Sequence, residues 1–272
     1  MTGGRPALTA ETVAPLVTPH GPLALVAVTP EQESTNTALV AALKDDPESW
    51  PHMAAYLADH QTAGRGRSGR VWETPQGVAL TVSWVLRPRA AGPDLAWAPL
   101  VVGLATVRAL RSLGADAWLK WPNDVVVESG DEDVPGWGRW RKVAGILCEV
   151  VGDAVVAGTG VNVLQSAEEL PVPHAASLAT LGADTSRLQV LEALGAKLGE
   201  AAAAWDADPA AIREEVAEVC ATLGWEVAVD VGTGAPVTGR AVGLGREGSL
   251  IVESARGGRT AVLAGDVRVR RA

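Results

Sequence analysis

Runs of apolar residues and their spacing divide the chain into predicted strands and helices. Before about residue 223, short runs rich in β-branched and aromatic residues predict strands. These runs are 23–29, 53–59, 78–86, 117–128, 143–151 and 155–164. Stretches with helical spacing are 38–43, 95–113, 184–205 and 208 to about 224. The mixture predicts an α+β domain in which helices pack on a mixed β-sheet.

The pattern changes near residue 223. Residues 225–270 hold five short strand-like runs separated by glycines, a texture typical of a small antiparallel barrel. We therefore expect a main domain over 23–223 and a small barrel domain over 224–272. Residues 1–22 are rich in Pro, Gly and Thr and show no clear period, so we expect a loosely ordered N-terminal arm there.

Composition narrows the class of protein. The 272 residues carry 23 Lys and Arg against 32 Asp and Glu, a net charge of 23 − 32 = −9, which disfavours non-specific binding to nucleic acid or anionic membranes. We see neither an apolar run of membrane-span length nor a signal-peptide pattern. The two cysteines, Cys148 and Cys220, fit a reducing compartment. We therefore expect a cytoplasmic protein that binds no membrane.

The segment Gln61–Arg70 is the most informative stretch of the chain. Three arginines and three glycines fall within the seven residues Gly64–Arg70. Glycine lets a backbone approach a ligand closely, and arginine offers a planar charged fork to phosphate or carboxylate. The G-x-G-x-x-G spelling also occurs in dinucleotide-binding loops, but Pro75-Gln-Gly77 blocks the helix that must follow, and a P-loop lysine is missing. An anion-binding loop is favoured over a surface turn with solvated arginines.

Three further segments place polar residues beside apolar runs. Lys120-Trp-Pro-Asn-Asp124 interrupts a strand-like run, which indicates a bulge or strand end at a site, or else a simple turn. Lys142 stands at the entrance to a strand that continues through Gly145. Gly158–Asn162 lets a backbone approach a ligand and then offers one amide. The last two patterns are common in unrelated proteins when each is taken alone.

Taken together and in this order, these segments resemble the biotin protein ligase family, also called biotin–[acetyl-CoA-carboxylase] ligases. The matching stretches are Ser34–Asn36, Gln61 with Gly64–Trp72, Lys120–Asp124, Lys142–Glu149, Gly158–Asn162 and Ala176–Leu178. The resemblance implies that biotin and ATP react to biotinyl-5′-AMP, from which the biotinyl group passes to a lysine of a carrier domain. It also implies a mixed-sheet catalytic domain, binding biotin and ATP, followed by an SH3-like β-barrel.

The resemblance assigns roles to individual residues. Those implied to bind biotin are Ser34, Thr35, Gln61, Gly64, Arg65 and Gly145. Those implied to bind ATP are Arg67, Arg70, Trp72, Lys120, Asn123, Lys142 and Asn162, with catalytic roles for Lys142, Arg67, Arg70 and Lys120. Within this set, Lys142 is implied at the reacting carboxylate and α-phosphate, and Asn162 at the adenine, with Trp72 stacked near it. Mg²⁺ is the implied metal ion, and Asp124 its implied ligand.

The partners also follow from the resemblance. The acceptor is implied to be the biotin carboxyl-carrier domain of acyl-CoA or pyruvate carboxylases, and the enzyme a monomer or weak homodimer. Some family members carry an N-terminal winged helix that binds DNA. Only 33 residues precede Ser34, without a helix-turn-helix pattern, so we expect the ligase-only type and no DNA binding.

Three alternatives and one unexplained feature remain at this stage. A lipoate or octanoate transferase shares the fold but should lack the Gly/Arg segment in this form. A biotin-responsive repressor and a non-catalytic acyl-adenylate sensor are the other two. The segment 129–141 is longer and more acidic than is usual in the family between two strands, and the sequence assigns it no role.

Overall fold

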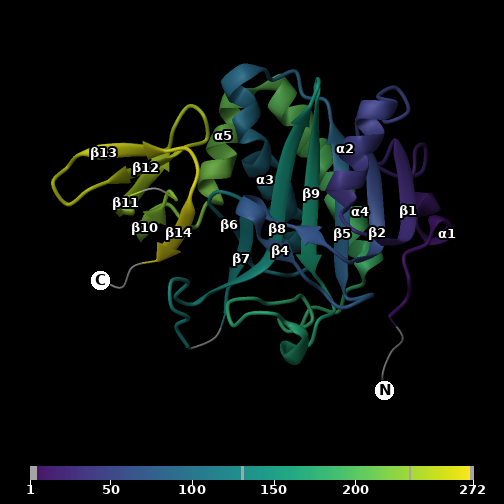
Figure 1. Cartoon of the computed structure of the whole chain (residues 1–272), viewed down its shortest axis with the longest axis horizontal. Helices are drawn as coiled ribbons and strands as arrows, with labels where there is room; N and C mark the ends of the chain where they lie inside the picture. The colour runs from purple at the N-terminus through teal and green to yellow at the C-terminus, as the bar shows by residue number, and fades with distance from the viewer. Residues whose placement is uncertain (1–4, 130–131, 233, 270–272) are drawn as a thin grey trace.

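The computed structural model describes residues 5–129, 132–232 and 234–269. Parts of the predicted arm, of the 129–141 segment and of the last predicted strand therefore lie outside the described residues. The main element of the protein is a seven-stranded sheet in the order β1-β2-β5-β9-β8-β7-β6 (Figure 1). The strands are β1 (Leu25–Gln32), β2 (Ala54–Gln61), β5 (Ala79–Leu86), β6 (Ala117–Lys120), β7 (Asp124–Glu128), β8 (Trp140–Val151) and β9 (Ala154–Asn162). β1 and β2 pair in parallel and the other neighbours pair antiparallel, so the predicted mixed sheet is confirmed.

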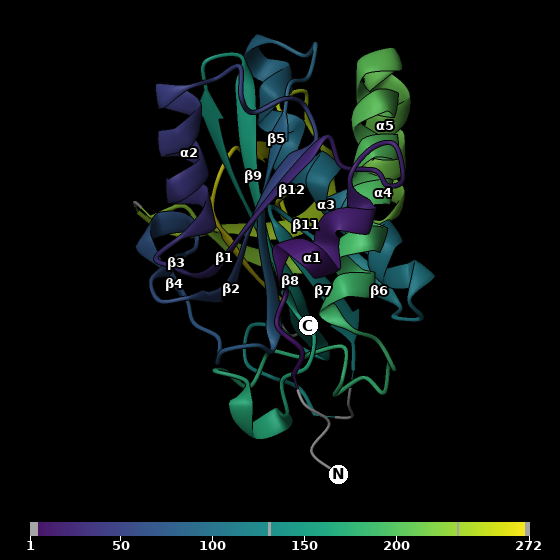
Figure 2. The ribbon, with the colours of Figure 1, turned by 90° about the vertical axis from the view of Figure 1, so that its right-hand side faces the viewer.

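Helices cover both faces of this sheet. α2 (Thr35–Asp45) lies on one face, while α3 (Ala98–Ser112), α4 (Arg187–Ala207) and α5 (Pro209–Glu218) lie on the other (Figure 2). Local sequence fixes where the helices begin. The Ser34 hydroxyl accepts a hydrogen bond from Thr37 N at the start of α2. Asp208, which precedes Pro209, accepts hydrogen bonds from Ala210 N and Ala211 N at the start of α5. Ser and Asp are favoured N-cap residues, and Pro is favoured at the first helical position.

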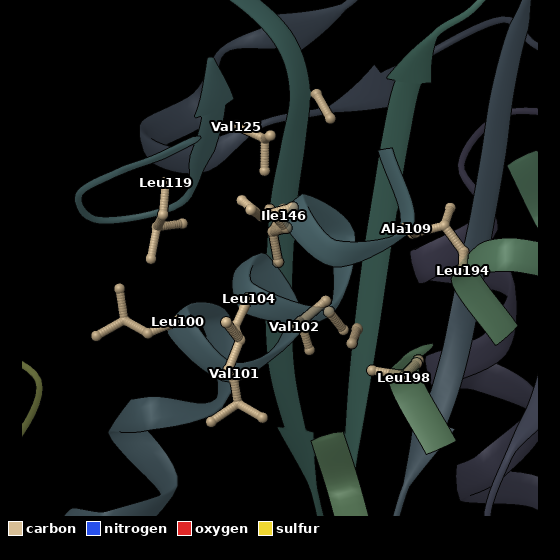
Figure 3. Packing of buried hydrophobic residues seen from close by; sticks show 14 of the residues in the cluster. Leu100, Val101, Val102, Leu104, Ala109, Leu119, Val125, Ile146, Leu194 and Leu198 are labelled. Carbon is tan, nitrogen blue, oxygen red and sulfur yellow. The ribbon is translucent and has the colours of Figure 1, made fainter. Parts of the chain in front are cut away.

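The larger core lies between the sheet and α3 and α4. Leu100, Val101, Val102 and Leu104 of α3 are buried in the same core as Ile146 of the sheet, and Figure 3 shows some of its side chains. The segment Gly92–Ser112, which spans a short 3₁₀ turn and α3, is 21 residues long, and an 18-residue window within it has a mean hydropathy of 1.2. By length and composition alone, this helix would be long and apolar enough to cross a membrane. Since 67% of its apolar window is buried inside the protein, it behaves as the core helix of a globular domain.

The N-terminal residues differ from the predicted loose arm. α1 (Ala10–Val13) is capped by Thr9 and followed by a 3₁₀ turn over Ala14–Leu16. Leu8, Val13 and Leu16 are buried in the larger core. The prediction of loose order is therefore wrong for residues 5–22, because three apolar side chains spaced along a Pro-rich segment suffice to dock it.

The single run predicted over 117–128 is a hairpin. β6 and β7 pair antiparallel around a turn at Trp121-Pro122-Asn123. Trp121 is 1% exposed, and its indole Nε1 donates to the Gly248 carbonyl at 2.8 Å. The polar interruption thus marks a strand end, one of the two outcomes that its composition indicated.

The C-terminal part forms a second, smaller sheet. Its strands are β10 (Glu226–Asp230), β11 (Val237–Leu244), β12 (Leu250–Glu253), β13 (Arg259–Val262) and β14 (Asp266–Val269). They pair antiparallel in the order β13-β12-β11-β10-β14, which confirms a small C-terminal antiparallel sheet. The predicted closed barrel is not formed, because β13 and β14 lie at opposite edges and do not pair within the described residues.

Candidate active site

A cavity of about 620 Å³ opens at one end of the large sheet, a size suited to a small ligand. Its walls are the Gly/Arg segment, the start of α2, β8 and β9, the β6–β7 turn, residues 171–175 and β14. All four predicted segments therefore converge on one cavity. Gly64 is the one proposed site residue that does not line it.

The Gly/Arg segment is a small hairpin. β3 (Gly64–Arg65) pairs with β4 (Val71–Trp72), and Gly66 N donates to Arg70 O at 2.7 Å. Gly69 has a φ of +74°, which favours glycine. A Cβ at Gly64 would lie 2.4 Å from the Trp72 carbonyl oxygen, so Gly64 permits the close strand pairing.

The three arginines of the hairpin reach different partners. Arg67 Nη1 donates to Asn123 Oδ1 at 3.1 Å, which brings it to the β6–β7 turn. Arg70 forms an ion pair with Asp266 of β14, and this partner raises the pKa of Arg70. Arg65 lies at the cavity rim, 53% exposed, and donates to Thr37 Oγ1 at 3.3 Å. The hairpin is therefore tied to α2, the β6–β7 turn and the C-terminal sheet.

Two glycines of the sheet leave room for the Trp72 ring. A Cβ at Gly160 would lie 2.7 Å from Trp72 Cε2, and one at Gly145 would lie 3.3 Å from Trp72 Cζ3. The indole thus lies flat against β8 and β9. Its Nε1 is buried and has no hydrogen-bond partner among the described residues. Trp72 therefore packs on the sheet in this structure. The resemblance implied instead that Trp72 stacks near the adenine.

Polar groups at the start of α2 form a buried network at one end of the cavity. Gln61 Oε1 accepts from Thr35 N at 2.8 Å and from Thr35 Oγ1 at 3.0 Å. Ser83 Oγ lies 2.8 Å from Thr35 Oγ1 and 2.6 Å from Asn36 Oδ1. Ser34, the N-cap of α2, is 3% exposed. A ligand at this end would meet several fixed donors and acceptors.

The other end of the cavity holds a cluster of charges. The Asp124 carboxylate lies 2.6 Å from Lys142 Nζ and 3.9 Å from Lys120 Nζ. Burial alone would raise the pKa of Asp124, but Lys142 and Lys120 hold the pKa below its usual value. Burial lowers the pKa of Lys120, which is 3% exposed. With Arg67 and Arg70 alongside, this end suits a highly charged anion.

Asn162 has a structural task in addition to its place in the cavity wall. Its Nδ2 donates to Ala176 O at 3.0 Å, and its Oδ1 accepts from Gln165 Nε2 at 2.9 Å. Asn162 therefore holds the 174–178 segment against the end of β9. Adenine, which the resemblance implies as a partner of Asn162, would have to bind an amide that already has these two hydrogen-bond partners.

Asp124 does not fit the role of a protein-built magnesium site. Both of its oxygens face lysines, and the described residues contain no group of three or more His, Cys, Asp or Glu that could hold a metal ion. Mg²⁺ prefers several oxygen ligands in near-octahedral geometry. We therefore derive no step through a metal ion held by this carboxylate.

Among the cavity residues that sequence reasoning did not assign, three make aromatic or charged contacts there. Trp137 and His174 stack with ring centroids 4.2 Å apart, and Asp266 pairs with Arg70. A tryptophan in a polar, glycine-rich loop was a signal for Trp137. His174 and Asp266 carried no local signal, because tertiary packing alone brings them to the site.

Comparison with known proteins decides the family. Residues 28–165 match the family model described as the biotin/lipoate A/B protein ligase family. The chain belongs to this family. The matched range holds the four segments that converge on the cavity, and the cavity is thus the candidate active site of a family member.

Individual relatives agree with this family membership. The chain is 36% identical to the biotin–[acetyl-CoA-carboxylase] ligase of Mycobacterium tuberculosis over 78% of this chain and 77% of that protein. It is also 36% identical to the bifunctional ligase/repressor BirA of Escherichia coli, over 50% of this chain and 40% of that protein. Among solved structures, the biotin protein ligase of Aquifex aeolicus in complex with biotin and ATP superimposes with a TM-score of 0.71 at 29% identity. That match covers 91% of this chain and 99% of the other.

Proposed function

We propose that this protein is a biotin–[biotin carboxyl-carrier protein] ligase that forms biotinyl-5′-AMP and transfers biotin to a carrier lysine. The observation that carries the proposal is the two-ended cavity, with a neutral hydrogen-bonding network at the start of α2 and a cationic cluster at Lys142, Lys120 and Arg67. Biotin and ATP together have this polarity, with a neutral ureido ring at one end and a triphosphate at the other. The relatives named as biotin ligases support the assignment.

The first step joins two anions, so the enzyme must reduce their repulsion. A carboxylate oxygen of biotin attacks the α-phosphorus of ATP, the bond to the β-phosphate breaks, and pyrophosphate leaves. Lys142 is in a suitable place to contact both the carboxylate and the α-phosphate, since its ammonium lies at the centre of the cationic end. Arg67 and Lys120 would stabilise charge as it moves onto pyrophosphate. Binding both reactants in one cavity supplies proximity.

The second step needs an open route for a protein nucleophile. The amine of the acceptor lysine attacks the acyl carbon of the mixed anhydride, AMP leaves, and the amine loses a proton. The Gly/Arg hairpin lines the cavity, and its arginines would retain the anionic adenylate until the acceptor arrives. We propose the carrier domain of a biotin-dependent carboxylase as that acceptor, because the name of the Mycobacterium tuberculosis relative specifies acetyl-CoA carboxylase.

The setting and reagents of the reaction are part of the proposal. ATP and biotin are substrates, and Mg²⁺ would enter with ATP, since Asp124 alone does not build its site. The two free cysteines, Cys148 and Cys220, are compatible with the reducing cytoplasm. Burial and the neighbouring Glu149 raise the pKa of Cys148 to about 12, so this thiol is not a nucleophile in the reaction.

The proposed function is tested by mass spectrometry of the product. Purified protein is incubated with ATP, Mg²⁺ and one of biotin, lipoate or octanoate, and the acyl-adenylate is measured together with pyrophosphate. Of the three acids, we expect only biotin to give an acyl-adenylate. Adenylate from lipoate or octanoate instead would assign the protein to the lipoate branch, and no adenylate from any acid would contradict the proposal.

A further inference from the structure

The loop over residues 132–141 is part of the active-site wall. Val134 and Gly138 exchange two backbone hydrogen bonds of 2.8 Å, which closes a tight turn around Gly136. Val269 N of β14 donates to Gly136 O at 2.9 Å. The loop therefore has a defined shape and is fastened to the C-terminal sheet. Its one large side chain inside the cavity is Trp137.

Trp137 contacts two groups in the cavity. Its ring stacks on His174, with centroids 4.2 Å apart and an interplanar angle of 12°. Lys120 Nζ lies 4.5 Å from the centroid of the Trp137 ring, well within cation–π range. The stacked imidazole fixes the orientation of the indole, and the indole in turn offers its negative face to the ammonium.

Lys120 needs such a partner. It is 3% exposed, and its nearest carboxylate, Asp124, is closer to Lys142 (2.6 Å) than to Lys120 (3.9 Å). A buried ammonium without a full counter-charge is costly and tends to lose its proton. An aromatic face is one of the few neutral groups that stabilise a desolvated cation.

We propose that Trp137 is a positioning residue that keeps the buried Lys120 ammonium charged and directed into the phosphate end of the cavity. The 132–141 loop, which lies outside the stretches that carry the family resemblance, thereby tunes ATP binding. The kinetic consequence rests on the proposed function, whereas the contact itself does not.

Other charges also act on Lys120, and the test must separate them. Asp124 on β7 and Asp266 on β14 favour its charged form, while Lys142 on β8 and Arg70 in the hairpin oppose it. His174 lies on the other segment packed against the indole. None of these residues is changed by a substitution at Trp137, so a titration difference between variants at that position reports the ring.

The first test measures the titration of Lys120 by NMR. The chain has four lysines, Lys44, Lys120, Lys142 and Lys197, so protein labelled with ¹³Cε-lysine gives few signals to assign. We expect the pKa of Lys120 to fall in Trp137→Leu, which keeps an apolar side chain but removes the ring. In Trp137→Phe, we expect the pKa of Lys120 to lie between its values in the wild type and in Trp137→Leu. Trp118→Leu is the matched control, because Trp118 makes a cation–π contact with Arg111 outside the cavity.

The second test is a double-mutant cycle on the first half-reaction. Trp137→Leu should raise the KM for ATP in biotin-dependent pyrophosphate exchange about three- to tenfold, with little change in the KM for biotin. In a Lys120→Ala background the same substitution should have little further effect. An equal rise in both backgrounds, or a Lys120 titration that Trp137→Leu leaves unchanged, would overturn the proposal. A wild-type protein without exchange activity would contradict the proposed function, and the NMR titration would still decide the role of Trp137.

Discussion

At the residue scale, the cations of the candidate site outnumber the carboxylates that face them. Lys142 and Lys120 face one carboxylate, Asp124. Arg67 reaches a neutral amide oxygen of Asn123. The cluster therefore has an excess of positive charge, which an incoming phosphate or carboxylate would neutralise. This excess occurs in a chain whose net charge is −9.

Loss of the Lys142 ammonium should stop the first half-reaction while leaving the fold intact. Lys142→Ala is expected to slow biotin-dependent pyrophosphate exchange by about 10²–10³-fold, the usual cost of one donor to developing charge. Lys197→Ala is the control, because Lys197 pairs with Glu200 on the surface of α4. Exchange at the wild-type rate, in a variant with an unchanged melting temperature, would remove Lys142 from the catalytic residues.

Loss of the Asp124 carboxylate should cost stability as well as activity. Asp124→Ala leaves Lys120 buried without its nearest counter-charge, and breaking such a cluster destabilises a protein by about 3–5 kcal/mol. Urea unfolding measures the change. The Glu200→Ala variant, which breaks an exposed pair, should show the wild-type midpoint. A wild-type midpoint for Asp124→Ala would mean that water already screens the two lysines.

At the element scale, the Gly/Arg hairpin is held at its two ends. The Trp72 ring packs on the glycines of β8 and β9, and Arg70 pairs with Asp266 of β14. The sequence predicted a loop at these residues, and the anion binding that it predicted for the loop stays a prediction. The sequence could not predict the ion pair with β14, because 196 positions separate the partners and only the docking of the C-terminal sheet brings them together.

A methyl group at Gly160 should release the hairpin. The Cβ in Gly160→Ala would meet the Trp72 ring at 2.7 Å, so the indole must shift and the hairpin loses one anchor. Trypsin should then cleave after Arg65, Arg67 or Arg70 faster than in the wild type. The control is Gly199→Ala on α4, where a Cβ would meet Met53 Cε at an ordinary 3.8 Å. Equal cleavage of Gly160→Ala and wild type would show that the indole does not hold the hairpin.

At the scale of the whole molecule, the candidate active site lies where the two sheets meet. The β6–β7 hairpin is bound to the C-terminal part through Trp121, and the 132–141 loop is bound to β14. Periodicity predicted the mixed sheet, the helices and the change of texture near residue 223, because these depend on local burial. It did not predict the docked N-terminal segment or the open second sheet, because both depend on long-range contacts that leave no period in the sequence.

The pH dependence of stability should report the packing of His174. Burial and the neighbouring Lys142 lower the pKa of His174 from 6.5, so the folded protein favours the neutral ring. This contribution is fully present above the unfolded pKa and is lost as the pH falls through it and then through the lower folded pKa. His52 shares this direction because of its own burial.

The His174→Gln variant should therefore lose less stability than the wild type between pH 7 and about pH 5. Chemical denaturation at a series of pH values measures the slope. Substitution of the exposed His20 by Gln is the control for replacing a histidine away from the cavity. A slope in His174→Gln as steep as in the wild type would mean that His174 is solvated in both states.

We propose that one cavity holds biotin at the start of α2 and the nucleotide phosphates at the lysine cluster. The most direct measurement is a crystal structure of the protein with a non-hydrolysable biotinyl-5′-AMP analogue. We expect the ureido ring beside Ser34, Thr35 and Gln61, and the phosphate mimic within hydrogen-bond distance of Lys142 or Arg67. Binding of the analogue elsewhere, or in the reverse orientation within this cavity, would contradict it.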